Sequence, residues 1–289
     1  MRLALGTVQF GLAYGIANQG GQTSRLEAGA ILEHASACGI DMLDTAIAYG
    51  DSEQCLGEIG IQNWKVISKL PAMPADCTDV RGWVAESVQA SMDRLGVEHL
   101  YGLLLHRPQQ LLESQGEQLF RALEALKADG LVAKTGVSAY GVNELDALAP
   151  HYRFDLVQAP FNVLDQGLLS SGWMKRMAIE GTELHVRSLF LQGLLLMTPS
   201  ARPQKFSRWA DLWQEWDSWL RQSGLSPLQA CTRYVLSFPE IAKAVTGVDN
   251  LVQLRQIVDA ASGALPLMPP LTLRCDDPDL INPSRWHQL

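Results

Sequence analysis

The sequence GIDMLDTAIAYGDSEQCLGE, residues 39–58, contains a strand, a loop and the start of a helix in quick succession. Its apolar first part predicts a short buried strand that ends at Asp44. A helix is expected over residues 52–59, and Tyr49 lies on the loop that precedes it. Polar side chains on loops that a rigid scaffold holds in place often contact ligands, so Asp44 and Tyr49 are candidate functional residues.

The same alternation of a short apolar strand and a helical pattern continues along almost the whole chain. Strands that are apolar throughout and separated by helices indicate a parallel sheet covered on both faces. Eight such units in 289 residues predict a closed (β/α)8 TIM barrel of the α/β class, with an extra helix before the last strand. The expected strands are residues 3–5, 42–44, 65–69, 100–105, 134–138, 155–158, 183–188 and 244–246.

A doubly wound open sheet is the alternative fold. No G-x-G-x-x-G follows the first strand, so the dinucleotide-binding fingerprint of that fold is missing. The proline-rich tail, residues 265–289, is expected to be irregular and to cross the barrel mouth or one flank. Since no linker, internal repeat or low-complexity segment is visible, we expect a single domain over residues 1–289.

Composition narrows the class of function. The formal net charge of -8 and the lack of a Lys/Arg cluster argue against a nucleic-acid partner. The five cysteines are scattered without metal-ligand spacing, which fits reduced thiols better than a disulfide framework or a zinc site. No run approaches the ~20 apolar residues that cross a bilayer. We therefore expect a cytoplasmic protein without a membrane or metal requirement; the oligomeric state stays open, with a monomer slightly favoured.

Four polar residues lie at or just after the expected C-terminal ends of strands, where the active sites of such barrels are found. Asp44 and Tyr49 belong to the second strand and its loop, Lys69 ends the third strand, and His106 follows the fourth. Each alone could be a solvated, capping or hydrogen-bonded structural residue. Their occurrence at three neighbouring strand ends favours a common site.

The four side chains permit a specific reaction. Tyr49 could give a proton to a substrate oxygen while a hydride reaches the attached carbon. A phenol with a pKa of ~10 is a poor acid at neutral pH, and we expect the Lys69 ammonium to favour the phenolate and ease proton transfer. Asp44 would hold Lys69 ionised, and His106 could donate a hydrogen bond to the same oxygen.

Four motifs, DTAIAYGDSEQCLGE, VISKLP, LLLHRP and KTGVSAY, resemble the aldo-keto reductase superfamily. The resemblance extends over nearly the entire chain and implies a (β/α)8 barrel that reduces aldehydes and ketones with NADPH. By motif, it makes Tyr49 the proton donor and assigns Asp44, Lys69 and His106 to the rest of a tetrad. The chain's two ends also resemble a bacterial subgroup associated with sugar and polysaccharide metabolism, which implies a polyhydroxylated carbonyl substrate.

The resemblance also implies where the nicotinamide cofactor binds. Arg187 occupies the position of an aromatic residue that usually stacks on the nicotinamide; it could stack likewise, meet a phosphate or substrate oxyanion, or be a rim arginine bonded to a carboxylate. Arg255 is the only basic residue in the 2′-phosphate region, and Asp249 lies nearby, which suits NAD(H), although family grounds rank NADP(H) first. The implied cofactor residues are Gly6, Thr7, Ser138, Gln158, Arg187, Ser188, Leu189, Gln192, Gly193, Thr246, Gly247, Gln253 and Gln256.

Aromatic residues on loops after strands one, six and seven are expected to line the substrate pocket: Phe10, Tyr14, Phe161 and Phe190. Two other functions stay open. The first is a catalytically weak cofactor-sensing or binding protein on the same barrel, which would not need lysine and aspartate support for Tyr49. The second is a sugar isomerase or lyase, which would need a metal cluster or a nucleophilic lysine.

Overall fold

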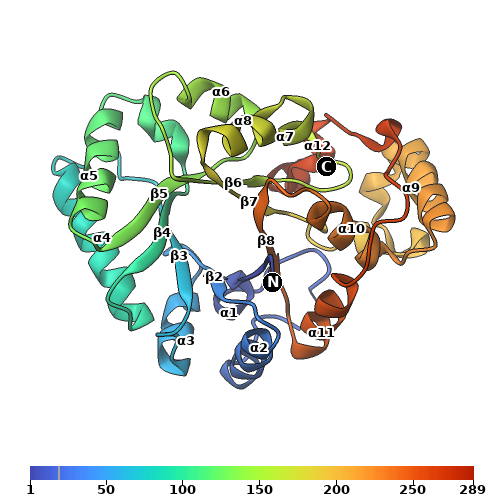
Figure 1. The fold of residues 1–289 in the computed structure, drawn as a ribbon, viewed down its shortest axis with the longest axis horizontal. Helices are drawn as coiled ribbons and strands as arrows, with labels where there is room; N and C mark the ends of the chain where they lie inside the picture. Colours follow the sequence, from blue (N-terminus) through green and yellow to red (C-terminus); the bar gives the residue numbers. More distant parts are fainter. Residues whose placement is uncertain (19) are drawn as a thin grey trace.

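The computed structural model describes residues 1–18 and 20–289, and its eight parallel strands form a closed barrel. Each strand pairs with its neighbours in sequence order, and β1 pairs with β8 to close the ring. Figure 1 shows the helices arranged around the outside of these strands. The predicted (β/α)8 fold is confirmed. The strands are β1 (Leu3–Gly6), β2 (Met42–Asp44), β3 (Lys65–Leu70), β4 (Leu100–Leu105), β5 (Val132–Ser138), β6 (Leu156–Pro160), β7 (Glu183–Arg187) and β8 (Ile241–Gly247).

Helices connect the strands, and α9 with α10 supplies the extra helix predicted before the last strand. The α-helices are α1 (Val8–Gly11), α2 (Arg25–Ala37), α3 (Ser52–Ile59), α4 (Val80–Leu95), α5 (Gly116–Ala128), α6 (Val142–Leu148), α7 (Gly167–Ser170), α8 (Trp173–Glu180), α9 (Ala210–Ser223), α10 (Pro227–Leu236), α11 (Leu251–Ala260) and α12 (Pro278–Ile281). Turns of 3₁₀ helix cover Pro108–Leu112, Leu194–Leu196, Pro199–Ala201, Gln204–Trp209, Leu271–Leu273 and Pro283–Gln288.

The C-terminal tail is less irregular than the sequence predicts. It forms α12 and the 3₁₀ turns Leu271–Leu273 and Pro283–Gln288. Short polar side chains cap α12 and the second turn: Asp277 accepts the amide of Asp279, and Asn282 accepts that of Ser284. A proline follows each cap at the first helical position, where its fixed φ is favourable. Residues 282–284 lie along the cavity described below, so the tail does reach the barrel mouth.

Two apolar layers hold the barrel together. A small cluster of apolar side chains from six of the strands fills the inside of the barrel. The larger core lies between the strands and the helices. No side chain fits at Gly136 on β5, where a Cβ atom would lie 1.7 Å from the Leu156 carbonyl oxygen on β6. The inner cluster is Ala4, Met42, Ile67, Leu104, Leu156 and Val245.

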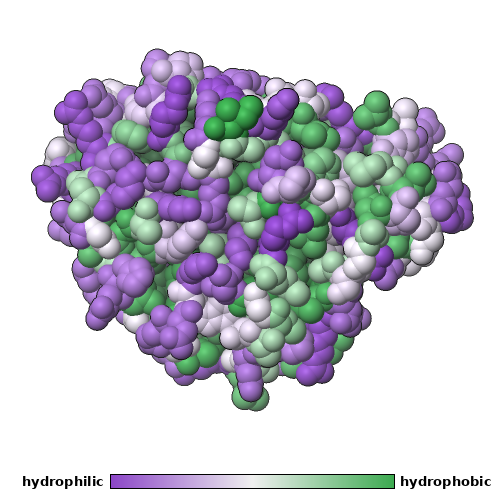
Figure 2. Space-filling model, viewed as in Figure 1, coloured by the Kyte–Doolittle hydropathy of each residue, from purple (hydrophilic) through white to green (hydrophobic). Residues whose placement is uncertain are grey.

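Hydrophilic residues cover most of the face shown in Figure 2, with smaller hydrophobic areas between them. In the described part of the chain, no helix combines the length and apolar character needed to span a membrane.

A buried carboxylate joins α3 to the barrel and to α4. Oε1 of Glu53 accepts hydrogen bonds of 2.6 Å from the hydroxyls of Ser68 on β3 and Ser91 on α4. Oε2 accepts two bonds from the Arg94 guanidinium, at 2.9 and 2.6 Å. The Glu53 side chain is 2% exposed. Because a buried charge is tolerated only when it is paired and hydrogen-bonded, these three partners fix the start of α3.

Glu53→Ala should therefore destabilise the protein by about 2 to 4 kcal/mol, since it leaves two hydroxyls and a cation without their acceptor. The matched control is Glu117→Ala, which removes a 72% exposed carboxylate paired with Arg121 and should cost less than about 1 kcal/mol. Urea unfolding gives both free energies. Equal losses in the two variants would contradict the structural role of Glu53.

Candidate active site

A buried ion pair lies at the C-terminal ends of β2 and β3. Lys69 Nζ is 2.7 Å from Asp44 Oδ2 and also donates to the Thr45 carbonyl oxygen at 2.8 Å. The Lys69 side chain is only 1% exposed. Burial by itself lowers the pKa of Lys69, but the nearby Asp44 carboxylate and Tyr49 phenol outweigh it, so its pKa is raised. The lysine therefore stays a cation at neutral pH.

Asp44 has a second partner that the sequence did not reveal. Gln158 Nε2, on β6, donates a 2.6 Å hydrogen bond to Asp44 Oδ1. The carboxylate can only accept, so the amide nitrogen must face it. Ser138 Oγ in turn lies 3.3 Å from Gln158 Oε1 and donates to it. Both carboxylate oxygens of Asp44 therefore accept a hydrogen bond, and the bond from Gln158 helps to fix the position of the Asp44 side chain.

Tyr49 lies between the ion pair and the imidazole of His106. Lys69 Nζ is 5.0 Å from the centroid of the Tyr49 ring, and the Tyr49 and His106 rings meet edge to face with centroids 5.8 Å apart. Burial raises the pKa of Tyr49 more than the Lys69 charge lowers it. The Lys69 charge acts on the phenol pKa in the expected direction, but burial outweighs it, so the net shift is upward. The phenol keeps its proton at neutral pH, which is the state that a proton donor requires.

His106 is a neutral imidazole at neutral pH. Burial lowers its pKa to about 4, and the positive charges of Lys69 and Arg187 act in the same direction. A neutral imidazole carries one N–H, so His106 can donate one hydrogen bond to an oxygen atom without adding a charge. The four predicted catalytic residues are thus together, with a phenol and an imidazole above a buried lysine and aspartate.

A cavity of about 660 Å³ opens above these residues. Asp44, Tyr49 and His106 line it, while Lys69 lies beneath them. Its volume is in the range of cofactor and ligand pockets. All the cofactor residues predicted from the sequence line it as well: Gly6, Thr7, Ser138, Gln158, Arg187, Ser188, Leu189, Gln192, Gly193, Thr246, Gly247, Gln253 and Gln256.

Two of the four predicted substrate residues lie elsewhere. Tyr14 and Phe190 line the cavity. Phe10 and Phe161 are fully buried in the core, so the prediction that they line the substrate pocket is wrong. Phe10 belongs to the short helix α1, and Phe161 packs against Tyr234 with ring centroids 5.5 Å apart. Their loops begin at the barrel mouth, but the side chains turn into the apolar layer.

The cavity wall formed by β1 and β8 has unpartnered polar atoms. Gln9 Oε1 and Thr246 Oγ1 are buried and lack a hydrogen-bond partner within the described residues, and both residues line the cavity. A Cβ atom at Gly247 would lie 2.4 Å from Gln9 Oε1, so glycine leaves room for that side chain. Because buried polar atoms are nearly always paired, this wall suits a polar ligand such as a nicotinamide dinucleotide.

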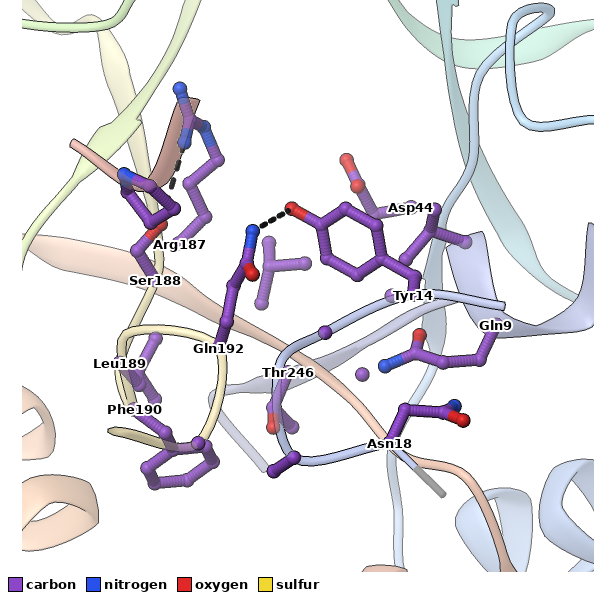
Figure 3. Close-up of a pocket in the computed structure, with 18 of the residues that line it drawn as sticks. Gln9, Tyr14, Asn18, Asp44, Arg187, Ser188, Leu189, Phe190, Gln192 and Thr246 are labelled. Atoms are coloured by element: carbon purple, nitrogen blue, oxygen red, sulfur yellow. Dashed lines mark hydrogen bonds between the residues drawn. The ribbon is translucent and has the colours of Figure 1, made fainter. Parts of the chain in front are cut away.

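The loop after β7 has an unusual backbone. Ser188, Leu191 and Gln192 have φ angles of +64°, +45° and +51°, a region that residues other than glycine rarely adopt. Gln192 Nε2 donates a 3.1 Å hydrogen bond to the hydroxyl of Tyr14, on the loop after β1 (Figure 3). Such strain collects at ligand-binding segments that the surrounding structure holds in place.

Arg187 faces the same cavity from the end of β7. Its guanidinium donates to the Ala139 carbonyl oxygen at 3.0 Å and lies 5.0 Å from the centroid of the Tyr140 ring. Within residues 1–18 and 20–289 its hydrogen-bond partners are the Ala139 carbonyl oxygen and the Ser188 hydroxyl rather than a carboxylate, so the alternative of a rim arginine bonded to a carboxylate is not observed. Its other N–H groups remain available to a ligand.

The His106 pKa has a measurable consequence for stability. The folded pKa of about 4 lies below the ordinary value of 6.5, so between these pH values the unfolded chain binds the proton first. The contribution of neutral His106 to stability should be complete above pH 6.5 and be lost as the pH falls to about 4. An NMR titration of His106 should give this low pKa, and Arg187→Gln should raise it. A wild-type pKa near 6.5 would contradict the described environment.

Comparison with known proteins identifies the family. Residues 2–268 match the model of the aldo/keto reductase family. An uncharacterized oxidoreductase of Bacillus subtilis, YqkF, is 24% identical over 261 residues, 83% of this chain and 84% of the relative.

Two solved structures under 25% identical share the fold. The aldo-keto reductase AKR11C1 from Bacillus halodurans has a TM-score of 0.72 at 20% identity, covering 94% of this chain and 89% of that one. The glycerol dehydrogenase AKR11B4 from Gluconobacter oxydans has a TM-score of 0.69 at 19% identity, covering 91% and 87%. With the family model matched over nearly its whole length, this chain belongs to the aldo/keto reductase family of oxidoreductases.

Proposed function

We propose that the protein reduces an aldehyde or ketone to the alcohol with a nicotinamide cofactor, and that Tyr49 donates the proton. The observation that carries this proposal is the buried Lys69–Asp44 pair beneath a protonated Tyr49, with neutral His106 beside it. A bound NAD(P)H would supply the hydride for the carbonyl carbon. The residues that would hold it are the cavity-lining set from Gly6 to Gln256 given above.

The chain's own residues would handle the proton and the charge. A substrate oxygen between the Tyr49 hydroxyl and the His106 imidazole would receive a hydrogen bond from each. As negative charge develops on that oxygen, Tyr49 would transfer its phenolic proton to it. The nearby Lys69 ammonium would stabilise the phenolate left behind, and Asp44 would keep Lys69 in place. His106, being neutral, would orient the oxygen and remain unchanged at the end of the step.

A cofactor-sensing protein with little turnover is the alternative. A binder needs the cavity wall but has no use for a charged lysine held under a tyrosine. Burying both ions costs several kcal/mol before their attraction repays it. We therefore propose an enzyme, since the buried Lys69–Asp44 pair would stabilise the Tyr49 phenolate that forms during catalysis.

For the substrate, we propose a small polyhydroxylated carbonyl compound. Polar residues line the cavity together with Tyr14 and Phe190, which suits the polar and apolar faces of a sugar derivative. One structural neighbour is by name a glycerol dehydrogenase. We also propose a cytoplasmic location, because the five cysteines are free thiols.

Tyr49→Phe removes only the phenolic hydroxyl and should lower kcat by about 10²–10⁴-fold, the usual contribution of a general acid. Nucleotide affinity should change little, because the ring remains. The measurements are carbonyl reduction followed by NAD(P)H absorbance, with aldoses and simple aldehydes as substrates, and nucleotide titration by fluorescence.

The matched control is Tyr101→Phe. Tyr101 lies at the start of β4, at the other end of the strand from His106, and its hydroxyl bonds to Glu183. This variant should keep full activity. Unchanged turnover in Tyr49→Phe, or equal losses in the two variants, would overturn the role assigned to Tyr49.

A further inference from the structure

The cavity has a second end, away from the tetrad, at the turn between β8 and α11. Asp249, Gln253 and Gln256 line it there. Figure 3 places Arg187 and Asn18, which bonds to Asp249, on opposite sides of the cavity. If the proposed function holds and the nicotinamide reaches Tyr49, the adenosine half of the dinucleotide extends to this second end.

The Asp249 side chain is fixed at this end by neutral groups. Asn18 Nδ2 donates to its Oδ1 at 2.8 Å, and Gln253 Nε2 donates to its Oδ2 at 3.2 Å. The Asp249 amide donates back to Gln253 Oε1 at 2.8 Å, and the Thr23 hydroxyl donates to its carbonyl oxygen at 3.1 Å. A carboxylate has about four acceptor positions, so it can still accept a hydrogen bond from a ligand hydroxyl.

The N-terminus of α11 has fewer free amide N–H groups for binding an anion than a helix N-terminus usually has. The Leu251 amide already donates to Glu27 Oε1 at 2.6 Å, and the Gln253 amide donates to the Asn250 side chain at 3.0 Å. At the start of α2 the Glu27 amide donates to the Ser24 hydroxyl, while the Glu27 carboxylate accepts from the Leu251 amide of α11. Two carboxylates, Asp249 and Glu27, therefore contribute negative charge to this turn.

No compensating cation lies at this end within the described residues. Of the described arginines and lysines, only Arg187 lines the cavity, and it lies at the tetrad. Arg255 is exposed on α11 and is not part of the cavity wall. Arg285, next to the tail residues that line the cavity, pairs with Asp279 at 2.7 Å.

We infer that this enzyme selects NAD(H) over NADP(H), the reverse of the order that its family resemblance suggests. The 2′-phosphate of NADPH would bring a second anion to Asp249 and Glu27 with no cation to offset the repulsion. The 2′-hydroxyl of NADH would instead donate a hydrogen bond to Asp249, as an acidic residue does for the ribose in other NAD-binding folds.

Nucleotide titration of the substrate-free protein tests this, with NADH and NADPH emission as the readout. The wild type should bind NADH at least about tenfold more tightly, because like charges brought together at a binding site repel each other. Asp249→Asn should bring the two dissociation constants close together, mainly by tightening NADPH binding. Gln256→Lys, which adds a cation to the same wall, should tighten NADPH binding without removing Asp249.

The matched control is Asp259→Asn, which makes the same charge change on α11 outside the cavity and should leave the ratio as in the wild type. Tighter binding of NADPH by the wild type would overturn the inference and leave the proposed function intact. An Asp249→Asn ratio equal to that of Asp259→Asn would also overturn it. Failure of the wild type to bind either nucleotide would instead overturn the proposed function.

Discussion

The buried pair of Lys69 and Asp44 is the interaction on which the rest of the site depends. Taking two charges out of water costs several kcal/mol for each ion, and the geometry must be good to repay this. Here the Thr45 carbonyl oxygen and the Gln158 amide complete the hydrogen bonding of the pair. Asp44 and Gln158 are 114 residues apart in the chain, and the closed barrel brings the ends of β2 and β6 together for this contact.

Much of this arrangement could be predicted because parallel strands end at the same edge. The pattern of apolar segments located the ends of β2, β3 and β4, and Asp44, Lys69 and His106 occur there one strand after another. The cavity-lining residues at the ends of β5 and β8, such as Ser138 and Thr246, came instead from the resemblance to the family. Because all strands run in the same direction, the C-terminal end of each lies at the same end of the barrel. Small errors in the predicted strand boundaries do not change this.

The direction of a side chain could not be predicted in the same way. Phe10 and Phe161 begin at the correct edge, but burial of a large apolar ring favours the layer beneath the helices over a wet pocket. Similarly, the sequence showed an ammonium near Tyr49 but not how deeply the phenol is buried, and burial decides the sign of its pKa shift. Glu27 of α2 accepts a hydrogen bond from the Leu251 amide of α11, 224 residues away, and this contact depends on how the two helices meet.

The left-handed residues after β7 have a consequence for engineering. Each non-glycine residue with a left-handed backbone lowers the free energy of unfolding by on the order of 1–3 kcal/mol. Ser188, Leu191 and Gln192 therefore destabilise the fold, and contacts elsewhere in the barrel must offset this. A search for heat-resistant variants would favour glycine at these positions, where the conformation is free of steric penalty. Glycine at residue 192 would remove the amide that joins the loop to Tyr14. Heat resistance and a preformed cavity wall are therefore opposing demands on the same few residues.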